Sequence, residues 1–361
     1  MRSAQGGDEF HVLMPEIRSS SDAIRLAEQI LDQVRAPFQV GEAELNLTAS
    51  VGIALYPADG DNAGDLLKHA DAAMYGAKQG GRDQFRFFTR EISERADRRL
   101  AIETALHQAL RNHELVLYYQ PKVAPATGAI TGMEALVRWQ RPDGRLAMPG
   151  EFIEIAEDSG LMGRIDRWVL EEACRQNAAW QAAGLLAVPV AVNLSAANAQ
   201  TEQFPMQLAD VLAATGLTAD FLQIEMTESQ MLDDTERFDA LIRSISALGV
   251  KVAIDDFGTG YSSLGYLQRF PFDILKIDQS FVRTLTGNSA QSAIVEAITR
   301  IARAFDFALV AEGVETAEQA AILQAYGCHE MQGYLYSRPV PAAQMEAMLQ
   351  PDYPALGRWK Q

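Results

Sequence analysis

Short apolar runs rich in β-branched residues alternate with amphipathic helical patterns along residues 115–334, and this alternation restricts the fold more than any other feature. Alternating strands and helices are typical of α/β proteins, in which helices cover a mostly parallel sheet. Eight strands spread over about 250 residues favour a TIM-type (β/α)8 barrel, with a doubly wound open sheet as the alternative. We predict the strands at 115–119, 130–139, 188–194, 222–226, 250–254, 274–277, 308–311 and 330–334.

The barrel hypothesis predicts where functional residues lie, because the carboxyl ends of the strands and the loops that follow them form one face. Polar side chains fall in or just after seven of the eight predicted strands. A single carboxylate at a strand end is usually a helix cap or a solvated loop residue, but so many acids buried together would be costly without cations. The candidates are Glu134, Arg138, Asn193, Glu225, Glu228, Asp255, Asp256, Lys276, Asp278, Glu312, Glu315 and Gln332.

Two adjacent carboxylates, Asp255 and Asp256, follow the strand predicted at 250–254 and precede a glycine-spaced turn. Neighbouring side chains in a strand point to opposite faces, so the two acids can share one cation only where the strand gives way to the loop. Two like charges side by side raise a pKa unless a positive group lies between them. For the pair alone a solvated acidic turn is the favoured interpretation, and the convergence of other acids on the same place would distinguish it from a cation site.

An all-oxygen cage for cations can be built from four carboxylates and one amide, Glu134, Asn193, Glu225, Asp255 and Glu312. We expect Asp255 to bridge two ions and Asp256 to complete the second site. Two divalent ions about 3.5–4 Å apart suit phosphodiester hydrolysis, because they activate water and stabilise the attacking and leaving oxygens. The five histidines form no metal-binding cluster and the two cysteines lie far apart, which favours Mg²⁺ or Mn²⁺ over Zn²⁺.

Two basic residues accompany the predicted cage. Lys276 can orient the nucleophilic water or neutralise phosphate oxygens, and its alternative role is a salt bridge to Asp278 or Asp255. Arg138 can clamp a phosphate through its guanidinium fork, and its alternative role is packing beside Trp139.

Composition excludes several classes of function. The net charge of −17 argues against binding to a nucleic-acid polymer, although a small phosphorylated ligand held by metals is compatible with it. No apolar run approaches the length of about 20 residues that a membrane span needs, and no signal peptide is recognisable. The isolated cysteines suit a reducing cytoplasm, so we expect a cytoplasmic protein, although a longer parent chain could be tethered to a membrane.

Residues 92–345 resemble the EAL family of cyclic di-GMP phosphodiesterases. Long motifs carry the resemblance, and they occur in the family's order. They are YYQPKV at 118–123, MEALVRW at 133–139, AVNLS at 191–195, IEMTES at 224–229, IDDFGTGYSSL at 254–264, LKIDQSFV at 275–282, VAEGVET at 310–316 and MQGYLYSRP at 331–339.

The resemblance implies hydrolysis of cyclic di-GMP to linear pGpG with two Mg²⁺ or Mn²⁺ ions, inhibition by Ca²⁺, and a homodimer formed through the EAL domain. It assigns the first metal to Glu134, Asn193, Glu225 and Asp255, and the second to Asp255, Asp256 and Glu312. It assigns catalytic roles to Glu134, Lys276, Glu312, Gln332 and Glu228, the last as anchor of the loop 257–263 that couples dimerisation to activity. Substrate contacts are assigned to Gln120, Arg138, Asp278 and Glu315. No position departs from the family pattern, which predicts an active enzyme.

Residues 1–91 resemble the GGDEF family of diguanylate cyclases, through GGDEF at 6–10, TASVGIALYPADG at 48–60 and HADAAMYGAKQGGRDQF at 69–85. The resemblance implies metal-ligand and catalytic positions at Asp8 and Glu9. Family members carry a βαβ unit before the motif, whereas five residues precede it here, so we expect no cyclase activity. We predict a turn at 6–9 between two strands, a helix at 21–34 capped by Ser21, a strand at 44–55, a helix at 63–78 and a strand at 84–88.

The sequence thus predicts a truncated GGDEF domain at 1–91, a connecting helix at 92–112 and an EAL barrel at 113–361. Two other functions are left open. One is a receptor that binds cyclic di-GMP without hydrolysing it, and the other is a barrel that hydrolyses a different phosphoester.

Overall fold

The computed structural model describes residues 2–4, 9–17, 19–41, 43–231, 235–259, 264–285 and 290–356. The chain divides into two compact units, Met1–Thr104 and Ala105–Gln361. Among the described residues, no helix combines the length and apolar character that crossing a bilayer requires.

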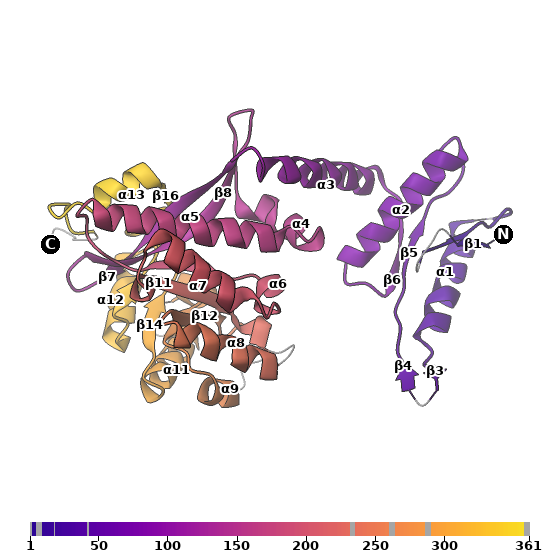
Figure 1. Ribbon diagram of the computed structural model, residues 1–361. Coiled ribbons are helices and arrows are strands. Elements are labelled where there is room, and N and C mark those ends of the chain that lie inside the picture. Colours follow the sequence, from indigo (N-terminus) through magenta and orange to yellow (C-terminus); the bar gives the residue numbers. More distant parts are fainter. Residues whose placement is uncertain are drawn as a thin grey trace. The chain divides into compact units, whose positions relative to one another are not determined.

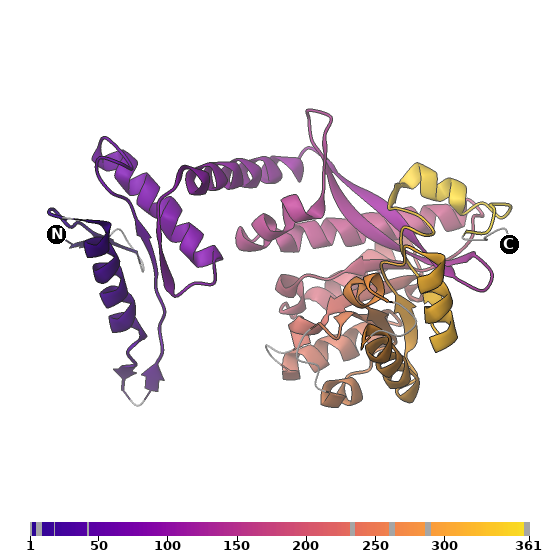
Figure 2. The same cartoon turned by 180° about the vertical axis from the view of Figure 1, so that it is seen from behind.

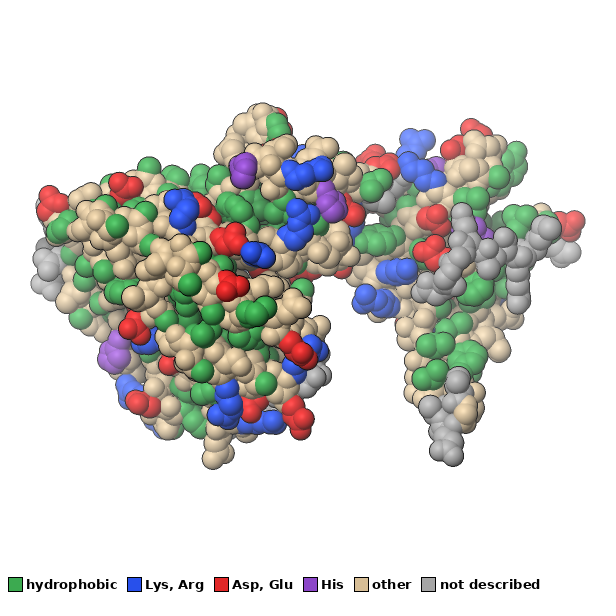
Figure 3. Space-filling model, viewed as in Figure 1, with side chains coloured by type: hydrophobic (Ala, Val, Ile, Leu, Met, Phe, Trp, Pro, Cys, Tyr) green, Lys and Arg blue, Asp and Glu red, His purple; other side chains and the backbone are tan. Residues whose placement is uncertain are grey.

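The first unit contains short paired strands and two packed helices. Strands β1 (Arg2–Ala4) and β2 (Phe10–Val12) are antiparallel, as are β3 (Phe38–Val40) and β4 (Ala43–Leu45), whereas β5 (Ser50–Ile53) and β6 (Gln84–Phe87) are parallel. Helices α1 (Ser20–Arg35) and α2 (Ala63–Gln79) pack on β5 and β6, and α3 (Arg90–Ala109) follows. Several large hydrophobic side chains of this unit are exposed, including Phe10, Leu13 and Tyr56. Figure 3 shows hydrophobic side chains on the visible face of this unit.

Two predictions for this unit need correction. The N-cap of α1 is Ser19 rather than Ser21, and its backbone N–H donates to the Asp22 carboxylate at 3.2 Å. The single strand predicted at 44–55 is two strands, because β4 turns back to pair with β3 while β5 pairs with β6. Glu9 is exposed just before β2, and Asp8 lies outside the described residues.

The second unit is a closed eight-stranded barrel, which confirms the TIM-type prediction (Figure 1). The barrel closes because β7 pairs with both β8 and β15, and two short strands, β9 (Leu146–Ala147) and β16 (Val340–Pro341), extend the sheet. The barrel strands are β7 (Leu115–Ala124), β8 (Ala129–Gln140), β10 (Val190–Asn193), β11 (Leu222–Thr227), β12 (Lys251–Phe257), β13 (Ile274–Ile277), β14 (Ala308–Ala311) and β15 (Glu330–Met331).

One strand departs from the all-parallel barrel pattern. Strand β7 runs antiparallel to both β8 and β15, while the other neighbouring barrel strands are parallel. Only four residues join β7 to β8, a connection too short for the crossover that parallel strands need. Figure 2 shows this long antiparallel pair with α13 (Ala342–Met348) packed beside it.

Helices cover the outside of the barrel and connect its parallel strands (Figure 1). They are α4 (Ile153–Asp158), α5 (Met162–Ala182), α6 (Ala196–Ala199), α7 (Phe204–Thr215), α8 (Thr235–Ala247), α9 (Leu264–Arg269), α10 (Gln279–Arg283), α11 (Ala290–Ala304) and α12 (Ala317–Tyr326), with short 3-10 turns at Pro149–Glu151, Ala219–Phe221 and Glu228–Met231.

Along the inward faces of β12, β13 and β14, the side chains change from apolar to charged over two residues. Ala253, Ile274 and Val310 form a buried apolar cluster. Because side chains in a strand alternate between faces, the residues two positions further along lie on the same face. These residues are Asp255, Lys276 and Glu312, so a charged layer lies directly beyond the apolar one.

A buried carboxyl outside this layer, Asp166 of α5, supports the loop after β10. It accepts hydrogen bonds from the Ser195 N–H at 3.1 Å and from Asn198 Nδ2 at 3.0 Å. Burial raises the pKa of Asp166 to about 6, although these hydrogen bonds act in the opposite direction. The folded chain therefore holds a proton at Asp166 in a pH range where the unfolded chain has lost it.

The contribution of Asp166 to stability should accordingly fall as the pH rises from about 4 to about 7, by about 2–3 kcal/mol. The Asp166→Asn variant should lack this decline, so the difference between its unfolding free energy and that of the wild type should depend on pH. Urea unfolding at both ends of the range measures the difference, with Asp210→Asn as an exposed control on α7. The same difference in unfolding free energy at both pH values would refute the raised pKa of Asp166.

Candidate active site

A buried lysine lies at the centre of the charged layer. The Nζ atom of Lys276, on β13, contacts Oδ2 of Asp255 at 3.0 Å, Oε1 of Glu312 at 2.6 Å and Oε2 of Glu225. Its side chain is 1% exposed. Residues from four neighbouring barrel segments therefore converge at one point, as the strand-end rule predicts. The contact with Asp255 is one of the two salt bridges that the sequence had left as an alternative role for Lys276.

A chain of amides connects Glu134 of β8 to the opposite edge of the site. Asn193 Nδ2 donates to Glu134 Oε1 at 2.7 Å, and Gln332 Nε2 donates to Glu134 Oε2 at 2.6 Å. Gln332 Nε2 also donates to Gln120 Oε1 at 2.9 Å, and Gln120 Nε2 donates to the carbonyl of Ser337. Glu134 is thus held by two amides that the sequence placed in the site.

Gln332 follows β15 rather than lying in the eighth strand as predicted. The backbone of the next residue, Gly333, lies against Val314, whose carbonyl oxygen would be only 2.2 Å from a Cβ atom at that position. Only glycine permits this approach, which fixes the backbone beside Gln332. The buried Oε1 atom of Gln332 has no hydrogen-bond partner among the described residues.

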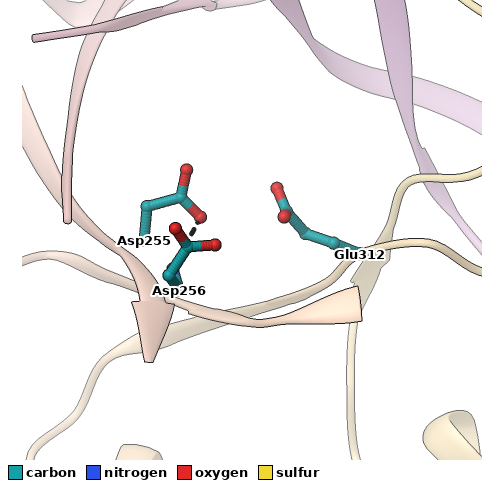
Figure 4. Close-up of side chains that lie close together, drawn as sticks. All are labelled: Asp255, Asp256 and Glu312. Carbon is teal, nitrogen blue, oxygen red and sulfur yellow. Dashed lines mark hydrogen bonds between the residues drawn. The ribbon is translucent and has the colours of Figure 1, made fainter. Parts of the chain in front are cut away.

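Asp255 and Asp256 lie on the same side of β12 because the strand bulges there. The pairing of β12 with β13 shifts register between Ile254 and Phe257, and Asp256 adopts a left-handed φ of 54°. Oxygens of Asp255, Asp256 and Glu312 lie within 4.8 Å of one another, and Figure 4 shows the two aspartates side by side with Glu312 facing them. The strand continues to Phe257, so a bulge rather than the predicted strand end brings the two acids together.

The acids of the cluster have pKa values that are shifted in different directions. Burial raises the pKa of Glu134 and of Glu312, and the neighbouring carboxylates add to this effect. Burial acts in the same direction on Glu225, but Lys122 and Lys276 outweigh it and lower the pKa of Glu225 to about 2. Burial and the Asp255 charge raise the pKa of Asp256 to about 6. Five clustered carboxyl groups therefore face two lysines, and the raised pKa values show that those acids favour a proton, or a cation in its place.

The other predicted residues surround this cluster. Glu228, at the start of a 3-10 turn, accepts the Gly258 N–H at 3.0 Å, while residues 260–263 of the loop that Glu228 was predicted to anchor lie outside the described residues. Asp278 caps α10 by accepting the Ser280 N–H. Glu315 is exposed, and its backbone N–H donates to Gln319.

Arg138 of β8 is buried and lies over the ring of Tyr118 at 5.6 Å, with one guanidinium nitrogen donating to the Val137 carbonyl. The alternative role predicted for it was packing beside Trp139, but the guanidinium that lies over the Trp139 ring, at 4.4 Å, is that of Arg141.

Sequence reasoning missed two buried polar residues, Lys122 and Gln223. Lys122 Nζ contacts Glu225 Oε1 at 2.8 Å and Gln223 Oε1 at 3.2 Å. A usable signal was present, since a lysine within a strand of mostly apolar residues, two positions beyond Gln120, suggests a buried partner. Gln223 lies two positions before Glu225 and therefore shares its face of β11.

The closed barrel, its reversed first strand and its polar cluster define a (β/α)-barrel protein with a site at the carboxyl ends of the strands. The comparisons with known proteins specify the family. The chain belongs to the EAL domain family, whose model matches residues 103–339. A second family model, "Diguanylate cyclase, GGDEF domain", matches residues 4–84.

Proteins similar to this chain are known both by sequence and by structure. The bifunctional diguanylate cyclase/cyclic di-GMP phosphodiesterase MucR of Pseudomonas aeruginosa is 43% identical over 95% of this chain and 50% of its own length. The cyclic di-GMP phosphodiesterase PdeR of Escherichia coli is 42% identical over 94% of this chain and 51% of its own length. The solved structure described as the PaMucR phosphodiesterase in complex with c-di-GMP matches with a TM-score of 0.66 and 42% identity, over 68% of this chain and 99% of that one. The chain spans about half the length of these curated relatives.

Proposed function

We propose that the barrel hydrolyses cyclic di-GMP to linear pGpG with two divalent cations, Mg²⁺ or Mn²⁺. The observation that carries the proposal is the convergence of Glu134, Glu225, Asp255 and Glu312 around one buried lysine. The names of the relatives support the substrate, because they are cyclic di-GMP phosphodiesterases and one was solved with this ligand.

The residues present suit the proposed cations. Every candidate ligand offers oxygen, and oxygens of Asp255, Asp256 and Glu312 lie close enough together to share an ion. Burial, and after it the neighbouring carboxylates, raises the pKa of Glu134 and of Glu312, and a bound cation would offset this cost of burying their charged forms. We assign one ion to Glu134, Asn193, Glu225 and Asp255, and the other to Asp255, Asp256 and Glu312. When bound, such ions activate water and stabilise the attacking and leaving oxygens.

The chain's own residues position the reactants. The buried Oε1 of Gln332 has no partner among the described residues, and we assign it to accept a hydrogen bond from the attacking water. Lys276 supplies positive charge against the phosphate oxygens that gain charge in the transition state. In the reaction, water adds across one phosphodiester bond, whose leaving oxygen takes up a proton. Glu134 and Glu312 serve catalysis as ligands, and Glu228 does so by holding the loop after β12 through Gly258.

Substrate contacts are proposed for Gln120 and Arg138, with Asp278 and Glu315 at the edge of the site. Gln120 is held at both ends of its amide by Gln332 and Ser337, which fixes its orientation. We also propose a homodimer formed through the barrel, which sedimentation equilibrium would test.

Calcium should inhibit the enzyme. Ca²⁺ takes more oxygen ligands at longer distances than Mg²⁺ and would misplace the water between the carboxylates. We expect activity in Mg²⁺ to fall at least about tenfold when equimolar Ca²⁺ is added. Initial rates at several ratios of the two ions measure the effect, and full activity in Ca²⁺ alone would contradict a tightly organised site.

A competition experiment tests the substrate. Hydrolysis of a generic chromogenic phosphodiester with Mn²⁺ is followed while cyclic di-GMP is added. We expect cyclic di-GMP to compete and to be consumed. A barrel specific for another phosphoester would cleave the chromogenic ester without competition.

A further inference from the structure

Lys122 of β7 is a buried cation that none of the roles above uses. Its side chain is 0% exposed, and the flanking residues Pro121 and Val123 are also buried. A buried ammonium is costly unless anionic or polar groups surround it. Its position therefore points to a specific partner inside the barrel.

That partner is Glu225, whose two oxygens are divided between two lysines. Lys122 contacts Oε1 at 2.8 Å, and Lys276 contacts Oε2. Gln223, on the same face of β11, accepts a second hydrogen bond from Lys122 at 3.2 Å and helps to hold the ammonium in place. Lys276 also contacts Asp255 and Glu312, whereas Lys122 contacts neither of them in the described structure.

We propose that Lys122 is a positioning residue of the metal centre, which holds Oε1 of Glu225 and leaves Oε2 as the single oxygen offered to a cation. This inference rests on the proposed metal-dependent function. Without Lys122, both oxygens of Glu225 become available to Lys276. The Glu225 carboxylate is then free to turn toward Lys276, Oε2 is no longer held in one direction, and cation binding weakens.

The test is Mn²⁺ binding to the full chain by titration calorimetry without substrate, for wild type, Lys122→Met and Lys251→Met. Lys251 of β12 is exposed, so its variant matches the change in charge and residue type without reaching the cluster. We expect Lys122→Met to bind Mn²⁺ about ten- to a hundredfold more weakly and Lys251→Met to bind as the wild type does. Equal or tighter binding by Lys122→Met would overturn the proposal, since loss of a nearby positive charge alone would strengthen cation binding.

A double-mutant cycle covers the case in which Lys122→Met folds poorly. The variant Lys122→Met/Glu225→Gln removes both members of the pair and leaves no unpaired charge between them. If Lys122 acts through Glu225, Lys122→Met should change Mn²⁺ affinity less than about twofold once Glu225 is glutamine. An undiminished effect in that background would overturn the role.

Turnover of cyclic di-GMP by the wild type, measured in parallel, separates this inference from the proposed function. Mn²⁺ binding that depends on Lys122 but produces no pGpG would leave the positioning role standing and remove the phosphodiesterase. Turnover to pGpG together with an Mn²⁺ affinity that does not depend on Lys122 would support the phosphodiesterase and remove the positioning role. A wild type that binds no Mn²⁺ would overturn both.

Discussion

The Asp255→Asn variant should hydrolyse cyclic di-GMP about a thousandfold more slowly than the wild type, or more slowly still. Asp255 is the acid that both proposed ion sites share, and its oxygens lie beside those of Asp256 and Glu312. Bound ions contribute several kcal/mol to the transition state, and each 1.36 kcal/mol corresponds to about a tenfold change in rate. Initial rates at saturating Mg²⁺ or Mn²⁺ measure the loss.

The fold should survive this substitution, because it removes one of several clustered negative charges and nearly preserves the shape of the side chain. Unfolding in EDTA should show stability at least equal to that of the wild type, while the extra stability that Mn²⁺ confers should disappear. Asp220→Asn, at an exposed aspartate, provides the control. Activity near that of the wild type in Asp255→Asn would remove Asp255 from the metal assignment.

The Lys276→Met variant should lose about 3–5 kcal/mol of unfolding free energy in EDTA. Lys276 is the ammonium that Glu225, Asp255 and Glu312 share, and its removal leaves buried carboxylates facing one another. Although burial by itself lowers the pKa of Lys276, these acids raise it well above its ordinary value, so the wild-type lysine is charged throughout the physiological pH range. Urea unfolding measures the loss.

Divalent cations should restore part of that stability, because they bind the folded cage and not the unfolded chain. Turnover should nevertheless stay low if Lys276 has its proposed second role of neutralising the phosphate oxygens. Lys251→Met, in the adjacent strand, should show neither effect. An unchanged unfolding free energy for Lys276→Met in EDTA would mean that the carboxylates do not depend on the lysine.

The barrel could be predicted because its parallel strands are buried on both faces and therefore appear as continuous apolar runs. The strands at 274–277 and 308–311 have the predicted bounds, and the other barrel strands differ from theirs by a few residues. The reversal of β7 was not predicted, because strand direction depends on a short connection rather than on apolar pattern. Most candidate site residues could be predicted from their place after a strand, whereas Gln120 was identified only through the family resemblance.

Two features of the site depend on pairing in three dimensions. The bulge that turns Asp255 and Asp256 to one side is a register shift against β13, which no local pattern specifies. Lys122 lies within the reversed strand β7. The strand-end rule applies to the carboxyl ends of parallel strands, so it does not predict a functional residue at this position. Its pairing with Glu225 joins residues about a hundred positions apart, so sequence spacing does not indicate it.

Product analysis by chromatography tests the central claim most directly. The chain is incubated with cyclic di-GMP and Mg²⁺ or Mn²⁺, beside Asp255→Asn and a sample in EDTA. The account predicts linear pGpG from the wild type with metal, and from neither control. Tight binding of cyclic di-GMP that stays intact would contradict it and identify the barrel as a receptor.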